Sequence, residues 1–152
     1  MGRIAAVALG SNLGDRRSHL DFAADRLRRL LGAFTISRYH ETKPVGVDAP
    51  QPLFLNAAAV GETGVSAREL LDALHAIERE RGRERPRVNA PRTLDLDLIL
   101  LGDLVLDEPG LVVPHPRFRE RRFVLEPLAA IAPDLVDPVT HRTISQLARD
   151  LG

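Results

Sequence analysis

Hydrophobic and polar positions along the first half of the chain predict three strands and one helix. A continuous apolar run at residues 4–9 is typical of a buried strand. Apolar residues then recur at helical spacing from about residue 18, and Gly32 closes that predicted helix. Strand character returns at residues 34–40 and again at residues 55–61. The pattern therefore predicts a strand, a helix and two further strands in this order.

The second half of the chain continues the alternation of predicted strands and helices. A capping box at Ser66–Glu69 opens an amphipathic helix that ends near Gly82. The strongest strand pattern of the chain covers residues 94–101. A turn at Gly102–Asp103 follows, and it predicts an antiparallel pairing of this strand with residues 104–106.

Two more helices complete the predicted elements. Residues 119–131 have a helical pattern, and a capping box at residues 143–146 opens a short last helix. Because strands alternate with helices while one turn points to antiparallel pairing, we expect an α+β sandwich, with a mainly antiparallel sheet flanked by helices, rather than a doubly wound sheet.

Composition narrows the classes of protein. The length of 152 residues suits one domain over residues 1–152. The formal net charge of zero argues against a domain that covers nucleic acid or an anionic membrane surface. The absence of cysteine excludes disulfides and thiolate metal sites, and the chain has neither a signal-peptide pattern nor an apolar run of membrane-spanning length. We therefore expect a cytoplasmic protein that binds no nucleic acid and no membrane.

The pair Asp95 and Asp97 is the first candidate for chemistry. Residues two apart in a strand project to the same face, so both carboxylates leave one side of the 94–101 strand, with Cα atoms about 6.6 Å apart. Two such carboxylates can bridge cations. When the pair is taken alone, the solvated face of a half-exposed strand is the more frequent explanation.

Arginines upstream of the aspartates favour the metal site. Six of them fall within fourteen residues: Arg79, Arg81, Arg83, Arg85, Arg87 and Arg92. The first two have a sufficient explanation at the end of a helix. The others fall in a segment broken by proline, where a solvated basic loop is the alternative. Metal-binding carboxylates beside arginines are what a polyphosphate needs.

Two other segments carry candidate binding residues. His115 stands between two prolines, which fix the direction of its imidazole, although a lone histidine is more often structural. The segment 117–123 alternates arginine with phenylalanine, as a solvated helix or a phosphate-binding segment beside a stacking ring would. Phe54 and Phe123 are candidates for the walls of a slot for a flat heterocycle. P-loop, Rossmann and zinc spacings are missing from the chain.

Six ordered motifs together resemble the 6-hydroxymethyl-7,8-dihydropterin pyrophosphokinases of folate biosynthesis. The motifs are Ala8–Gly14, Thr42-x-Pro-x-Gly46, Phe54–Ala58, Gly82-Arg83, Pro91–Asp97, and Val113-Pro-His115 with Arg121-x-Phe123. The resemblance implies a ferredoxin-like fold and transfer of the β,γ-diphosphate of ATP to the pterin hydroxymethyl group, with release of AMP. ATP and two Mg²⁺ ions are the implied co-substrate and cofactors, and we expect a monomer.

The resemblance also implies roles for individual residues. Asp95 and Asp97 would hold the metals, and Arg83 and Arg92 would join them as catalytic residues. The pterin contacts would come from Thr42, Pro44, Val45, Gly46, Phe54, Asn56 and Phe123. The ATP contacts would come from Leu71, His75, Glu78, Arg83, Arg85, Arg87, Arg92, Leu98, His115 and Arg121.

Two classes of protein remain as alternatives. One is a non-catalytic ferredoxin-like module that binds RNA, which the neutral charge and the lack of clustered strand aromatics disfavour. The other keeps the metal site but uses a different acceptor, as a nuclease or a nucleotidyl transferase would. The segment before Pro91 also departs from the family pattern, so the choice between Arg85 and Arg87 for the ATP contact stays open.

Overall fold

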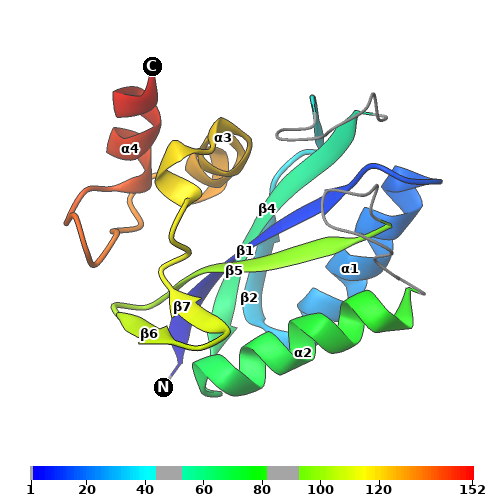
Figure 1. Cartoon of the computed structure of the whole chain (residues 1–152), viewed down its shortest axis with the longest axis horizontal. Helices are drawn as coiled ribbons and strands as arrows, with labels where there is room; N and C mark the ends of the chain where they lie inside the picture. Colours follow the sequence, from blue (N-terminus) through cyan, green and yellow to red (C-terminus); the bar gives the residue numbers. More distant parts are fainter. Residues whose placement is uncertain (1, 44–52, 82–92) are drawn as a thin grey trace.

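The computed structural model describes residues 2–43, 53–81 and 93–152. Its main sheet holds five strands: β1 (Arg3–Ser11), β2 (Gly32–Ile36), β3 (His40–Thr42), β4 (Phe54–Thr63) and β5 (Asp95–Leu101). The strand order is β2-β4-β1-β5, with β3 also paired to β4, and every pairing is antiparallel. Figure 1 shows β1, β4 and β5 crossing the centre of the molecule.

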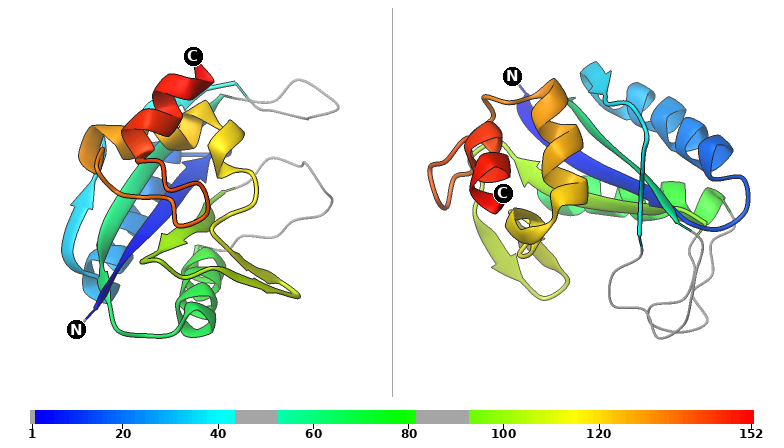
Figure 2. Two further views of the ribbon diagram at one scale, coloured as in Figure 1. Left: turned by 90° about the vertical axis from the view of Figure 1, so that its left-hand side faces the viewer. Right: turned by 90° about the horizontal axis from the view of Figure 1, so that it is seen from above.

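The helices lie on both faces of the sheet: α1 (Arg16–Leu30), α2 (Ala67–Glu80), α3 (Arg122–Ile131) and α4 (Ile144–Leu151). Figure 2 shows α1 and α2 on one face and α3 and α4 on the other. Along the chain, β1-α1-β2 is followed by β4-α2-β5, and these four strands lie in the order second, third, first, fourth. This is the ferredoxin-like arrangement, so the predicted α+β sandwich is confirmed.

The alternation of side chains along β1 explains the two cores. Val7 and Leu9 point to the face covered by α1 and α2, where they join Leu20, Leu70 and other buried residues in the larger apolar cluster. The smaller residue Ala6 points to the opposite face, in the cluster formed with α3 and α4.

Local signals placed the helix starts well. The capping boxes at Ser66–Glu69 and Thr143–Gln146 are both formed, with side chain and backbone bonded reciprocally. The helix predicted from residue 18 begins two residues earlier, since Asp15 is its N-cap and accepts the backbone N–H of Ser18 at 3.1 Å.

The strand predicted at residues 34–40 is divided in two. Ser37 donates its backbone N–H to the Ala58 carbonyl oxygen at 2.8 Å, and its hydroxyl accepts the Ala58 N–H at 3.0 Å. This hydroxyl takes the place of the next backbone acceptor, so the ladder of β2 ends at Ile36. The chain pairs with β4 again only at His40, as β3.

The predicted pairing of residues 94–101 with residues 104–106 is wrong. Gly102 has a positive φ of 56° and donates its N–H to the Ile4 carbonyl, and the chain then leaves the sheet. Residues Leu106–Glu108 (β6) instead pair with Leu111–Val113 (β7) in a separate hairpin. The helix predicted at residues 119–131 is confirmed from Arg122 to Ile131 as α3, but its start differs: Phe118–Glu120 form a 3₁₀ turn, which the extended residue Arg121 separates from α3.

Candidate active site

One row of residues crosses three strands on the face that α3 and α4 partly cover. Gly10 of β1 stands opposite Asn56 of β4 on one side and opposite Asp95 of β5 on the other. In the next row Ala8 stands between Ala58 and Asp97. Residues directly opposite one another point to the same face, so the amide and both carboxylates leave one surface. Two strand spacings of roughly 4.8 Å separate Asn56 from Asp95.

Gly10 allows two neighbouring side chains to approach the backbone in this row. A Cβ at this position would lie 3.1 Å from Asn56 Oδ1 and 3.6 Å from Phe54 Cδ1. The amide and the aromatic ring therefore lean over the backbone of Gly10, which only the absence of a side chain allows. No site role was predicted for Gly10 itself, although it ends an apolar run and lies within the Ala8–Gly14 motif.

Thr42 is bound into the same group. The amide of Asn56 donates through Nδ2 to the Thr42 hydroxyl, and Thr42 pairs with Phe54 across β3 and β4. Asn56 is buried, whereas Phe54 is half-buried. Three of the predicted pterin contacts thus come together in one small area of the sheet.

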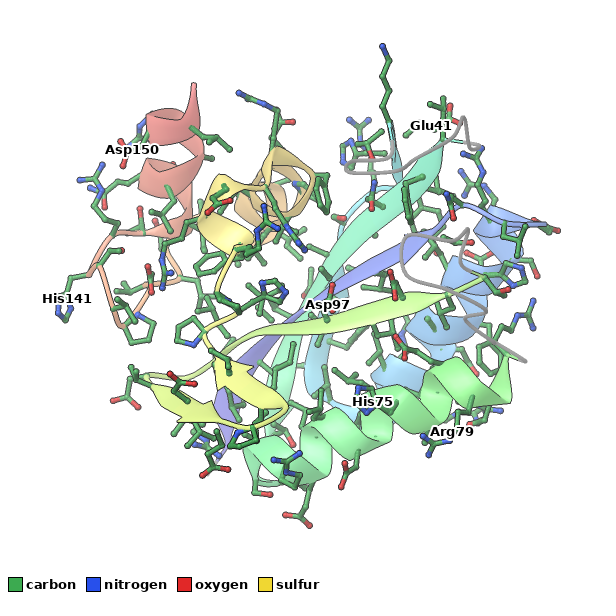
Figure 3. The ribbon with its side chains drawn as sticks, in the orientation of Figure 1. Glu41, His75, Arg79, Asp97, His141 and Asp150 are labelled. Carbon is green, nitrogen blue, oxygen red and sulfur yellow. The ribbon has the colours of Figure 1, made fainter. Side chains whose placement is uncertain are left out.

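Asp95 and Asp97 occupy the start of β5. Both are half-exposed, while Leu94, Leu96 and Leu98 on the other face are buried. The predicted projection of both carboxylates from one strand face is therefore confirmed. Figure 3 shows Asp97 on β5 above the helix α2 that carries His75.

Glu78 of α2 holds the outer edge of β5 between the two aspartates. It is only 3% exposed, and its Oε2 accepts the backbone N–H of Leu96 at 2.7 Å. Among the described residues β5 is the last strand of the sheet, so this N–H has no neighbouring strand there to bond. Glu78 was predicted as an ATP contact, and nothing in its sequence position indicated this bond to the strand.

The outer edge of β5 is also bound by the His115 segment, where the N–H of His115 donates to the Ile99 carbonyl at 2.9 Å. The Nδ1 atom of His115 accepts the backbone N–H of Arg117 at 3.1 Å.

Burial, and then the positive charges of Arg121 and Arg117, lower the pKa of His115 to about 4. The imidazole is therefore neutral near pH 7, and because Nδ1 accepts, Nε2 carries the proton.

Phe123 and Arg121 lie at the start of α3. Phe123 is half-buried against the apolar cluster that includes Ala58, on the same face as Asn56 and Asp95. The Arg121 guanidinium lies over the Phe123 ring, 5.6 Å from its centroid.

A buried carboxylate fixes the turn that precedes α3. Asp137 is fully buried and accepts from Arg119 Nε at 2.6 Å and Nη2 at 2.9 Å, from Thr140 Oγ1 at 2.6 Å and from the Val139 N–H at 3.0 Å. Burial alone would raise the pKa of Asp137, but these hydrogen bonds outweigh it and lower the pKa to about 2.

The remaining predicted ATP contacts lie on α2 and β5. Leu71 is half-buried, His75 is exposed, and Leu98 is buried on the α1–α2 face. Seven predicted contacts lie outside the described residues: Pro44, Val45, Gly46, Arg83, Arg85, Arg87 and Arg92.

The carboxylates suit magnesium by their chemistry. Within the described residues, no three His, Cys, Asp or Glu side chains gather into a ligand set. Mg²⁺ needs fewer, because it is commonly held by one or two carboxylates together with substrate phosphates and waters. The two half-exposed oxygen donors Asp95 and Asp97 beside the small residues Gly10 and Ala8 therefore fit such an ion.

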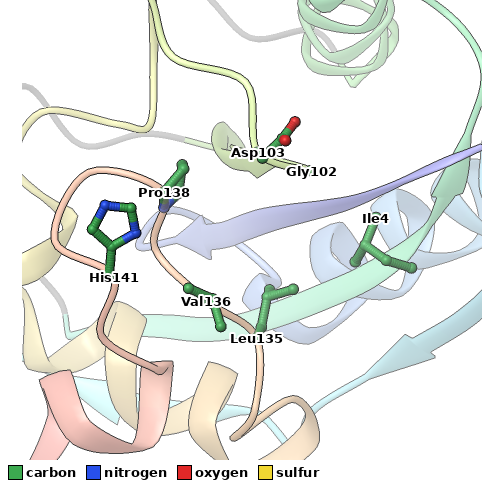
Figure 4. Close-up of a pocket in the computed structure, with 7 residues that line it drawn as sticks. All are labelled: Ile4, Gly102, Asp103, Leu135, Val136, Pro138 and His141. Carbon is green, nitrogen blue, oxygen red and sulfur yellow. The ribbon is translucent and has the colours of Figure 1, made fainter.

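A second hollow lies at the other end of the sheet (Figure 4). Ile4, Gly102 and Asp103 line one side of it, and residues of the 135–141 segment, including His141, line the other. Gly102 follows the last residue of β5, whereas Asp95 is the first, so this hollow is distinct from the polar row.

In the described part of the chain, no helix is long and apolar enough to cross a membrane.

Comparison with known proteins decides the family. Residues 6–133 match the model of the 7,8-dihydro-6-hydroxymethylpterin-pyrophosphokinase family. The chain belongs to this family.

Relatives and solved structures agree with this assignment. A Pseudomonas aeruginosa protein named 2-amino-4-hydroxy-6-hydroxymethyldihydropteridine pyrophosphokinase is 47% identical over 131 residues, covering 85% of this chain and 80% of that protein. A Bacillus subtilis protein of the same name is 40% identical over 148 residues, covering 96% of this chain and 88% of that protein. A crystal structure of Plasmodium falciparum HPPK-DHPS with pteroate matches with a TM-score of 0.78 at 15% identity. The match covers 99% of this chain but 41% of that longer one, so it supports the fold.

Proposed function

We propose that the polar face of the sheet is the active site at which this chain transfers the β,γ-diphosphate of ATP to the hydroxymethyl group of 6-hydroxymethyl-7,8-dihydropterin and releases AMP. The observation that carries the proposal is the row Asn56–Gly10–Asp95. It places an amide that can read a polar ring edge two strands from a carboxylate that suits a metal. A flat bicyclic acceptor lying over Gly10 has its ring at one end of this row and its reacting arm at the other.

The acceptor subsite would consist of Asn56, Thr42, Phe54 and Phe123. Asn56 can both donate and accept, as the edge of a pterin requires. Phe54 leans over Gly10, and Phe123 lies on the same face of the sheet, so the two rings supply the apolar walls for stacking. Pro44, Val45 and Gly46 remain predicted contacts of the same subsite.

Asp95 and Asp97 would hold the two Mg²⁺ ions of the reaction. Bound Mg²⁺ supplies neutralisation of phosphate charge and lowers the pKa of an oxygen that it contacts. The protein's own part is to keep the two carboxylates parallel on one strand. Glu78 contributes to this by closing the outer edge of β5 at Leu96.

The ATP side would be formed by α2, the His115 segment and Arg121. The neutral imidazole of His115 can donate its Nε2–H to a phosphate oxygen, while Arg121 supplies a positive charge. Further contacts are proposed for Leu71, His75, Glu78, Leu98, Arg83, Arg85, Arg87 and Arg92, with Arg83 and Arg92 meeting the charge that develops during transfer.

The reaction exchanges one phosphorus–oxygen bond for another. The hydroxymethyl oxygen attacks the β-phosphorus, and the bond from that phosphorus to the oxygen bridging the α- and β-phosphates breaks. AMP leaves with the bridging oxygen, and the hydroxyl proton passes to solvent. Asn56 and the two phenylalanines orient the attacking oxygen, which is a large part of catalysis in phosphoryl transfer.

An AMP-release assay with the pterin as acceptor tests the function. We expect AMP and the pterin diphosphate to form in equal amounts, and only when ATP, Mg²⁺ and the pterin are all present. AMP release without the pterin, or nucleotide transfer to another acceptor, would point to the alternative of a nuclease or nucleotidyl transferase.

We propose that the protein is a cytoplasmic monomer whose partners are its small-molecule substrates, ATP and the pterin. The neutral net charge supports the absence of a nucleic-acid partner. Light scattering of the purified protein gives its molar mass, and a mass of two chains would contradict the proposed monomer.

A further inference from the structure

Arg16 makes two contacts that tie a helix to the acceptor side of the polar row. It is the first residue of α1 and follows the N-cap Asp15. Its Nη1 donates to the Leu53 carbonyl oxygen at 2.8 Å, and its Nη2 donates to Glu41 Oε2 at 2.8 Å. Both contacts are made by the same guanidinium group, so one side chain connects α1 to the segments that contain Leu53 and Glu41.

The two partners of Arg16 directly precede predicted pterin contacts. Glu41 comes immediately before Thr42, and Leu53 comes immediately before Phe54. Thr42 and Phe54 pair with each other where β3 meets the start of β4. Arg16 therefore contacts the residues next to Thr42 at the end of β3 and next to Phe54 at the start of β4. These two residues carry the hydroxyl and the aromatic ring of the proposed pterin subsite.

Stability is a weak explanation for these contacts. The side chains of Arg16 and Glu41 are 27% and 53% exposed, and exposed ion pairs contribute about 0–1 kcal/mol. An effect of these contacts on the alignment of Thr42 with Phe54 would be much larger, because a displacement of about 1 Å in a positioning group can lower the reaction rate on the order of 100-fold. A planar fork can hold two diverging acceptors at once, and a lysine ammonium is a poor substitute for it.

We infer that Arg16 is a positioning residue for the pterin subsite: it fixes the strand ends that carry Thr42 and Phe54, and so sets the affinity for the acceptor but not that for ATP. This inference rests on the proposed function of the polar face. Arg16 itself need not touch either substrate.

The test compares Arg16→Gln and Arg16→Lys with Arg29→Gln. Arg29 lies on the same helix and pairs with Asp25 at 3.1 Å on the exposed surface, so it is a matched control. For Arg16→Gln we expect the KM for the pterin to rise roughly 10-fold, with the KM for ATP within about 2-fold of the parent and an unchanged unfolding midpoint. Arg16→Lys should lie between the parent and Arg16→Gln, and Arg29→Gln should match the parent.

A second variant separates the two contacts of Arg16. Glu41→Gln keeps an oxygen acceptor for Arg16 and leaves the Leu53 contact intact, so its effect on the pterin KM should be smaller than that of Arg16→Gln. Direct titration of the pterin in the presence of a non-hydrolysable ATP analogue should repeat the same order of affinities.

Three results have distinct meanings. A pterin KM within 2-fold of the parent in Arg16→Gln would overturn the inference while leaving the proposed function in place. Equal rises in both KM values would also overturn it, since they would indicate general damage to the fold. Absence of pterin-dependent AMP release in the parent protein would instead contradict the proposed function.

Discussion

Asn56 and Asp95 stand in the same row of the sheet, one on each side of Gly10. This relationship joins a group suited to recognising a heterocycle to a group suited to holding a metal. It arises because β1 lies between β4 and β5, which are far apart along the chain. The sheet order, and not the sequence spacing, brings the two halves of the site together.

Gly10→Ala should impair binding of the acceptor. The added Cβ would lie 3.1 Å from Asn56 Oδ1 and 3.6 Å from Phe54 Cδ1, so the amide that is proposed to read the acceptor must shift. We expect the pterin KM to rise by roughly 10-fold or more, on the magnitude of small displacements in binding sites. Gly64→Ala is the control, because nothing lies within 4 Å of a Cβ there. An unchanged pterin KM in Gly10→Ala would show that the acceptor does not lie over this glycine.

Glu78→Ala should weaken the fold as well as the activity. Removing the carboxylate leaves the buried N–H of Leu96 without this acceptor, and an unsatisfied buried group costs about 1–3 kcal/mol. Urea unfolding measures the loss. The neighbouring Glu80→Ala, which breaks an exposed pair with Arg26, should cost less than about 1 kcal/mol. Equal losses in the two variants would mean that the Leu96 contact is not important for stability.

His115 should make stability depend on pH in a defined window. Its pKa is lowered in the folded protein to about 4, from an ordinary value of 6.5. Between these two values the unfolded chain binds more protons, so the stabilisation is full above about pH 6.5 and is lost as the pH falls towards 4. Urea unfolding at pH 7, 5.5 and 4.5 should show a smaller loss of stability in His115→Asn than in the parent. Parallel curves for the two proteins would refute the lowered pKa.

Asp137→Ala should be among the more damaging single changes in the C-terminal part. The substitution leaves Arg119 without its buried partner, and breaking a buried pair typically costs about 3–5 kcal/mol. Asp150→Ala removes a similar but exposed partner from Arg142, and should cost less than about 1 kcal/mol. Thermal unfolding compares the two directly, and a similar fall in Tm in both would contradict the structural role of Asp137.

Local patterns predicted the parts of the site that depend on neighbouring residues. The projection of Asp95 and Asp97 follows from the two-residue period of a strand, and the capping boxes follow from side-chain bonds within one turn. Contacts between distant segments left no such pattern. The Glu78–Leu96 bond and the Arg16 contacts with Glu41 and Leu53 depend on how α2 and α1 pack beside the sheet.

The wrong pairing of residues 104–106 has the same origin. Gly102–Asp103 is a sound turn signal, but a turn does not say which strand the following residues will join. The Gly110 turn, with a φ of 76°, closes the competing hairpin of β6 and β7. Likewise, the hydroxyl of Ser37 ended β2 through a contact with Ala58, twenty-one positions away.

The most direct test of the account is AMP release by Asp97→Ala over a range of Mg²⁺ concentrations, with Asp103→Ala as the control, an exposed residue in the turn that follows the opposite end of β5. Because Asp97 is proposed as a metal ligand, we expect no measurable pterin-dependent AMP release at any Mg²⁺ concentration, with the circular dichroism spectrum of the parent retained. Asp103→Ala should follow the Mg²⁺ dependence of the parent. Near-normal AMP release by Asp97→Ala would contradict the assignment of the metal site.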